Sequence, residues 1–149
     1  MDPNNPVVKL CAAGISEEMA GRRGEAAKLY LDAWSSRTSD YEACIAAHYV
    51  ARLQSTPEDV LRWNSEALRF AESANDSELR GFFPSLYLNL GKSYEDLKNL
   101  ADAKKFYLLA EEAAGVLPDG EYAATVKRGI RNGLERVASS GETAAAQHA

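Results

Sequence analysis

The pair of residues best suited to chemistry is Cys44 and His48, which are four positions apart. On an α-helix this spacing places both side chains on one face, where they can ligate zinc or form a nucleophile–base pair. Zinc needs further donors, and the other histidine, His148, lies near the C-terminal end. A nucleophilic pair needs an orienting third group, which the sequence does not show. We therefore expect Cys11 and Cys44 to be buried free thiols, and we predict no metal, no cofactor and no enzymatic activity.

A second candidate is the stretch GRRGEAA, which begins at Gly21. Glycines and arginines before a helix can bind phosphate at the helix N-terminus. The same residues are typical of a tight turn between two helices, and we favour the turn. Adjacent carboxylates such as Glu95 and Asp96 fit a solvated helix face better than an acid–base couple. The sequence contains neither a phosphate-loop motif, nor a G-x-G-x-x-G motif, nor H-E-x-x-H.

The last long helical stretch is basic, with Lys127, Arg128, Arg131 and Arg136. Lys127 and Arg131 are one helical turn apart and share a face. Such a strip can bind an acidic partner, or it can simply give the end of the fold a soluble surface.

The composition excludes several classes of protein. The chain has 149 residues, a net charge of -5, 46% hydrophobic and 26% charged residues, which is ordinary for a globular protein. The acidic balance disfavours nucleic acid and anionic membranes as partners. No apolar run reaches the roughly 18 residues of a membrane span, and no basic cluster precedes the first apolar run. We therefore expect a cytoplasmic protein that binds neither membrane nor nucleic acid.

The elements that position these residues are predicted to be helices throughout. Alternating patterns are absent, and breakers divide the chain into seven helical stretches whose short loops favour antiparallel neighbours. Ser39 with Glu42 fits a capping box, and Thr56 fits an N-cap. The expected helices cover about 6–20, 25–36, 39–53, 57–74 and 84–97, then a sixth that follows KNLAD and ends near 114, and a seventh over about 121–138. The polar segment 139–149 is expected to be a flexible tail.

Small and large residues recur along the chain in step. Gly14, Ala26 and Ala33 recur as His48, Val60 and Ala67, and again as Gly91, Ala103 and Ala110. The third unit has the spacing W-x2-L-G-x2-Y, then A-x3-F, then A, in Tyr87, Leu90, Gly91, Tyr94, Ala103, Tyr107 and Ala110. This pattern resembles the tetratricopeptide repeat.

The resemblance implies about three helical-hairpin repeats, at residues 7–38, 41–76 and 84–117, stacked as a short right-handed superhelix. A capping helix at 121–138 would complete a single domain of residues 1–138. The first unit departs from the pattern at Glu17, which replaces an aromatic residue, and the second retains mainly Ala67.

The small residues predict close packing between helices rather than chemistry. Glycine or alanine at a crossing lets two helices approach, and a bulky neighbour fills the adjacent space. The predicted packing residues are Gly14, Ala26, Tyr30, Ala33, Ala67, Tyr87, Gly91, Tyr94, Ala103, Tyr107 and Ala110.

Proteins of this family usually bind peptides or protein segments in a groove lined by the first helix of each repeat. Carried over by position, the resemblance implies a groove formed by Tyr49, Arg52, Ser85, Asn89, Lys92 and Glu95. Asn89 matches a position where peptide-binding repeats use an amide to hold the ligand backbone. Ala12 and Ala46 occupy the equivalent places in the other units, so a basic clamp for a terminal carboxylate is not supported.

We therefore predict a non-enzymatic adaptor or scaffold that binds a peptide or protein segment in its concave groove. The alternative is a sensor or regulator that binds a small ligand or peptide in an all-α pocket around Cys44, His48, Tyr49 and Arg52. Self-association as a homo-oligomer is compatible with both. The sequence does not identify the partner, and it leaves open whether the groove or the basic face of the last helix is the binding surface.

Overall fold

The computed structural model describes the backbone of residues 1–148 and the side chains of residues 1–141. Within this range the protein is all-α, with seven α-helices, no strand and antiparallel packing of consecutive helices, which confirms the predicted fold class. The contacts divide the chain into two compact units, Met1–Arg80 and Gly81–Ala149, and each is described by itself. The single domain expected for residues 1–138 stays a prediction.

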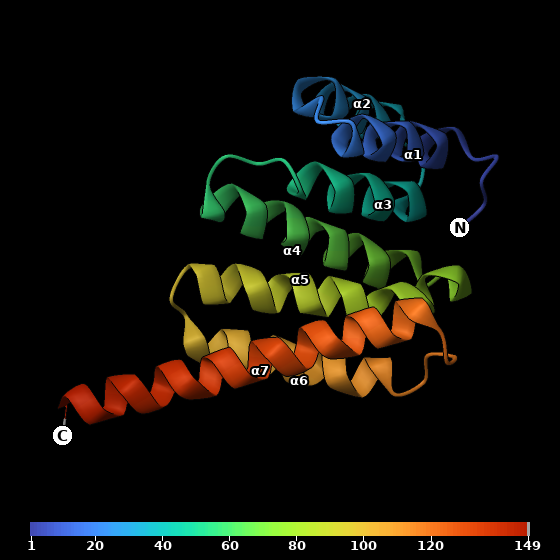
Figure 1. Ribbon diagram of the computed structural model, residues 1–149. Coiled ribbons are helices and arrows are strands. Elements are labelled where there is room, and N and C mark those ends of the chain that lie inside the picture. The colour runs from blue at the N-terminus through green and yellow to red at the C-terminus, as the bar shows by residue number, and fades with distance from the viewer. Residues whose placement is uncertain (149) are drawn as a thin grey trace. The chain divides into compact units, whose positions relative to one another are not determined.

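The first unit consists of two helical hairpins (Figure 1). α1 (Pro6–Met19) pairs with α2 (Arg23–Ser36), and α3 (Asp40–Ala51) pairs with α4 (Pro57–Ala74). α3 also packs against the first hairpin, where Ile45 and Ala46 join a buried apolar cluster with Val7, Cys11 and Ala33. α3 is therefore covered from two sides, by the first hairpin and by α4.

The helix starts of the first unit show how local sequence sets its elements. The Thr56 hydroxyl accepts a hydrogen bond from the Asp59 amide at 3.2 Å, and the Ser39 hydroxyl accepts one from the Glu42 amide at 3.1 Å. Both caps were predicted. The Glu42 carboxylate, however, accepts from the Thr38 amide at 2.8 Å instead of completing a capping box with the Ser39 amide.

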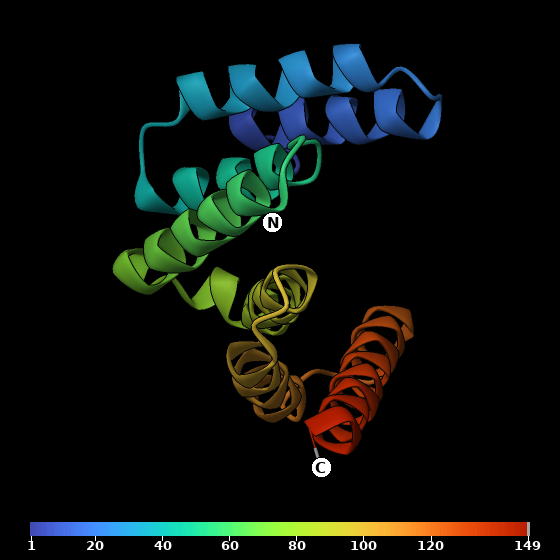
Figure 2. The same ribbon diagram turned by 90° about the vertical axis from the view of Figure 1, so that its left-hand side faces the viewer.

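The second unit is a hairpin with one long additional helix. α5 (Phe83–Asp96) pairs with α6 (Leu100–Ala114), and α7 (Glu121–His148) packs against both. Figure 2 shows α5 and α6 almost end on, with α7 beside them. A 3-10 helix, η1 (Ser77–Phe82), spans the point in the chain where the first unit ends and the second begins. α7 continues beyond its predicted end at Ala138, through a segment rich in alanine, which has the highest helix propensity. The flexibility predicted for residues 139–149 stays a prediction.

Glycine and tyrosine make the closest contacts between helices in both units. A Cβ atom on Gly91 would lie 2.6 Å from Cδ1 of Tyr107, and one on Gly14 would clash with the ring of Tyr30. Gly133 of α7 also lies against Tyr107, because a Cβ there would meet the same ring. Of the predicted packing residues, Tyr87 and Tyr94 are half-buried and all the others are buried.

We predict that Gly91→Ala destabilises the protein by about 1–3 kcal/mol, because the added methyl group must displace the Tyr107 ring in a packed interior. Gly24→Ala is the matched control, since Gly24 also lies in a helix but a Cβ atom added there would have no neighbour within 4 Å. The control should be neutral or slightly stabilising, because alanine favours helix. Urea denaturation measures both, and equal effects would contradict the steric explanation.

Candidate functional site

The two groove residues predicted in the first unit, Tyr49 and Arg52, are engaged in internal contacts. The Tyr49 ring stacks on the Tyr30 ring, with centroids 5.5 Å apart. Arg52 donates from Nη2 to Oε2 of Glu18 at 2.7 Å and from Nε to Oε1 at 3.1 Å. This bidentate pair fixes the guanidinium over α1.

The groove residues predicted in the second unit are held in a similar way. The Ser85 and Tyr122 hydroxyls are 2.7 Å apart, and the Lys92 ammonium donates to Asp96 at 2.8 Å. Glu95 pairs with a residue of α7, described below, and Asn89 is half-buried on α5. Polar side chains that the sequence suggested for ligand binding thus have partners within their own unit.

A Glu–Tyr–Arg cluster ties α7 to the α5–α6 hairpin. The Tyr107 hydroxyl donates to Oε1 of Glu95 at 2.6 Å. Arg136 of α7 donates from Nε to Oε2 of Glu95 at 2.9 Å and from Nη2 to Oε1 at 3.1 Å. One carboxylate therefore accepts hydrogen bonds from two other helices, which fixes the position of α7 along α5.

The first unit contains the same cluster. The Tyr30 hydroxyl donates to Oε1 of Glu18 at 2.9 Å, and Arg52, which follows α3, completes the group. One common sequence distance relates the residues of the two clusters. It separates Gly14 from Gly91, Glu18 from Glu95 and Tyr30 from Tyr107. In each unit the cluster therefore joins a hairpin to the helix that follows it.

The hydrogen bonds change the proton affinity of these groups. The Arg52 hydrogen bond lowers the pKa of Glu18 below its usual value, although burial acts in the opposite direction. Burial also opposes ionisation of Glu95, but hydrogen bonds from Arg136 and Tyr107 outweigh it and lower the Glu95 pKa. Burial first, and then the neighbouring carboxylate, raises the pKa of Tyr30 and of Tyr107. Both clusters are therefore carboxylate–phenol–guanidinium groups at neutral pH.

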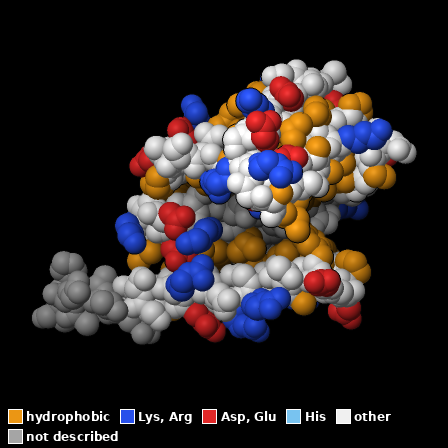
Figure 3. All heavy atoms as spheres, turned by 45° about the horizontal axis from the view of Figure 1, so that its top comes forward, with side chains coloured by type: hydrophobic (Ala, Val, Ile, Leu, Met, Phe, Trp, Pro, Cys, Tyr) orange, Lys and Arg blue, Asp and Glu red, His pale blue; other side chains and the backbone are white. Residues whose placement is uncertain are grey.

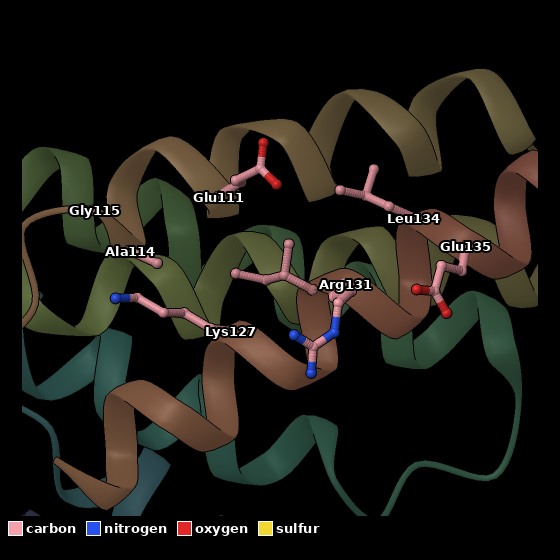
Figure 4. Close-up of a pocket in the computed structure, with 8 residues that line it drawn as sticks. Glu111, Ala114, Gly115, Lys127, Arg131, Leu134 and Glu135 are labelled. Atoms are coloured by element: carbon pink, nitrogen blue, oxygen red, sulfur yellow. The ribbon is translucent and has the colours of Figure 1, made fainter. Parts of the chain in front are cut away.

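A pocket of about 380 Å³ lies between α6 and α7. Its floor is apolar, formed by Ala114, Ile130 and Leu134. Lys127 and Arg131 line it from α7, as Figure 4 shows, which brings together the two basic residues predicted to share a face. The remaining lining residues are Glu111, Gly115 and Glu135.

A second pocket of about 350 Å³ extends the first toward the N-terminal end of α6. Leu134 lines both pockets, so they are neighbours along α7, and together they are called here the α6–α7 groove. The second pocket is also mainly apolar, with one cation at Lys104; its other residues are Leu100, Ala101, Val137, Ala138 and Gly141. Figure 3 shows basic and acidic side chains interspersed along α7.

The α7 cations that line this groove differ in their ionic contacts from Arg52 and Lys92. Over the residues whose side chains are described, neither Lys127 nor Arg131 takes part in an ion pair. Both side chains are exposed at the rim of an apolar floor. The sequence predicted the shared face of these cations but not the floor beside them, because Ala114 belongs to α6.

In the Cys44–His48 pair of α3, Cys44 is buried and His48 is half-buried. Burial raises the pKa of the Cys11 and Cys44 thiols to about 12, and both cysteines are free, as predicted. Burial, with a smaller effect from the Arg52 charge, lowers the His48 pKa to about 4. Residues 1–141 contain no group of three or more His, Cys, Asp or Glu side chains arranged to hold a metal ion.

Comparisons with protein-family models, with curated proteins and with solved structures found no match. What the structure supports is a protein of seven helices packed as sequential hairpins, without assignment to a family. Among the described helices, none is both long enough and apolar enough to span a membrane.

We predict that Arg136→Gln lowers the free energy of unfolding by about 1 kcal/mol at neutral pH, because Glu95 loses a bidentate partner that is half-exposed. The difference from wild type should narrow as the pH falls below 4.5, the usual pKa of a glutamate, because protonation of Glu95 removes the ion pair from the wild type as well. Arg128→Gln is the control. Urea denaturation across this pH range checks both statements, and a constant difference would contradict the pairing.

We also predict that His48 makes stability depend on pH between 6.5 and about 4. The unfolded chain binds a proton in this range and the folded chain does not, so stability is full above 6.5 and falls by up to about 1.4 kcal/mol per pH unit below it. His48→Gln should flatten the dependence between pH 6.5 and 5.5. His148→Gln, which changes the other histidine of the chain, should leave it as in wild type. Thermal unfolding across this range provides the measurement.

Proposed function

We propose that this protein is a cytoplasmic, non-enzymatic interaction module of the tetratricopeptide-repeat type that binds a segment of another protein. The observation that carries the proposal is the α6–α7 groove, where Lys127 and Arg131 border an apolar floor. Burial of apolar surface supplies most of the free energy of such binding, while the charges at the rim select the partner.

The repeat assignment is supported by two independent features. The third repeat of the sequence has the spacing of the family, and the helices pack as sequential hairpins. In addition, the two Glu–Tyr–Arg clusters, each beside a glycine that admits the tyrosine ring, repeat the same side-chain contacts in both units.

The α6–α7 groove has better support as the binding surface than the residues carried over from the family. Arg52, Lys92 and Glu95 each form an ion pair within the protein, so a ligand would have to compete with it. Lys127 and Arg131 form no ion pair among the described side chains, although Glu111 and Glu135 line the same pocket. The basic face of the last helix is therefore the surface we propose.

We expect a pull-down from native lysate to recover a specific protein with the wild type that is lost with Lys127→Glu/Arg131→Glu, because both cations that border the floor are reversed. Arg128→Glu is the matched control, since it makes the same kind of charge change on α7 outside the pocket. The control should retain the protein, which mass spectrometry identifies.

Two outcomes would contradict this proposal. Loss of the captured protein in Asn89→Ala/Lys92→Glu, but not in the α7 variant, would place the binding surface on α5. If the wild type recovers no protein from the lysate, the result contradicts an interaction module and favours a different function.

A further inference from the structure

The first unit shows what covers a groove of this kind. α4 lies on α2 and α3: it forms the hairpin with α3, and its Trp63 and Phe70 contact Trp34 of α2, with ring centroids 4.9 and 6.0 Å apart. The face of α3 that carries Ala43, Ala47 and Ala51 is buried. Ile45, Ala46 and Val50 of α3 join the apolar clusters of the first hairpin, and these three alanines belong to neither cluster.

The α6–α7 groove is the equivalent place in the second unit. One common sequence distance aligns α7 with α3. It relates Arg52 to Arg136, Tyr49 to Gly133 and Ala47 to Arg131. The contacts agree with this alignment, because Arg136 pairs with Glu95 as Arg52 pairs with Glu18, and Gly133 lies on Tyr107 as Tyr49 lies on Tyr30.

The sequence distance between Gly14 and Gly91 also aligns α6 with α2. In this alignment Glu111 corresponds to Trp34. Glu111 and Arg131 line the pocket of the second unit. Their counterparts in the first unit are Trp34, which contacts α4, and the buried Ala47. Within residues 81–141 no helix takes the position that α4 has in the first unit.

We propose that the α6–α7 groove binds an amphipathic α-helix of a partner protein, with acidic residues beside its apolar stripe. This inference rests on the proposed function and names the kind of segment that is bound. The helix takes the place on α6 and α7 that α4 has on α2 and α3.

The size and floor of the groove fit a helix. It is lined along α7 from Lys127 to Gly141, a length of about 20 Å at 1.5 Å per residue, which is about four helical turns. Ile130, Leu134 and Val137 recur at three- and four-residue spacing along that length. A partner helix with the same spacing can bury its stripe against this row.

The charges define the partner further. The buried alanines of α3 outside those clusters are Ala43, Ala47 and Ala51, whereas the matching α7 positions are the exposed Lys127, Arg131 and Glu135. The edge of the groove is therefore charged. A charged edge is typical of a surface that binds its partner reversibly rather than of a permanent helix–helix contact. Three cations, Lys104, Lys127 and Arg131, and two carboxylates, Glu111 and Glu135, line the groove. This excess of positive charge favours a helix with carboxylates beside its apolar stripe.

Two synthetic helical peptides of about 18 residues test the inference. Both have leucines at three- and four-residue spacing; one has glutamates beside the leucines, and its twin has lysines there. Fluorescence anisotropy measures the binding of each labelled peptide to the full chain. We expect the acidic peptide to bind the wild type and Arg128→Glu with similar affinity, and to bind Lys127→Glu/Arg131→Glu about tenfold or more weakly.

The lysine peptide is the control for folding, because we expect it to gain affinity for the charge-reversed variant, which a misfolded protein would not show. Equal binding of both peptides to the wild type, or equal weakening in Arg128→Glu, would overturn the inference. A wild-type dimer in sedimentation that Lys127→Glu/Arg131→Glu dissociates would assign the groove to a second copy of the chain and would also overturn it. Lysate capture that depends on Lys127 and Arg131, with neither peptide bound, would reject the helical ligand and leave the proposed function standing.

Discussion

Tyr107 holds three helices of the second unit together through one side chain. Its ring lies where Gly91 of α5 and Gly133 of α7 leave space, and its hydroxyl donates to Glu95. The ring requires close approach of the helices, and close approach brings Glu95 within reach of Arg136. Packing and electrostatics therefore meet at one residue, because the ring that fills the space beside the glycines also carries the hydroxyl that binds Glu95.

This coupling has a consequence for binding. Glu95 accepts hydrogen bonds from Tyr107 and Arg136, so its carboxylate is occupied by contacts within the protein. In the first unit, Arg52 and Glu18 are occupied by each other in the same way. The residues that resemble ligand contacts in the sequence thus stabilise helix positions. The α7 face that points away from Arg136 keeps its charges for solvent or for a partner, which is why the proposed site lies there.

Much of the fold followed from local patterns. The helix starts at Thr56 and Ser39 were predictable because a capping residue acts on amides two or three positions away. The role of Gly91 was predictable because the repeat spacing places it opposite a large residue. The role of Gly133 was missed, since the repeat pattern ends before α7. Glu42 was assigned to a local capping box, but its carboxylate also accepts from Asn5, which is 37 positions away.

The sequence by itself determined the helical class, the number of helices and the close packing at small residues. These features depend on propensity, caps and periodicity, which act within a few turns of one helix. The tertiary structure decided which charges are paired and which remain at the surface. Glu95 and Arg136 are 41 positions apart, and Ala114 and Lys127 line one pocket from two helices, so their distances depend on how α7 packs against α5 and α6. No local pattern contains that packing, because it is set by the shapes of several helices together.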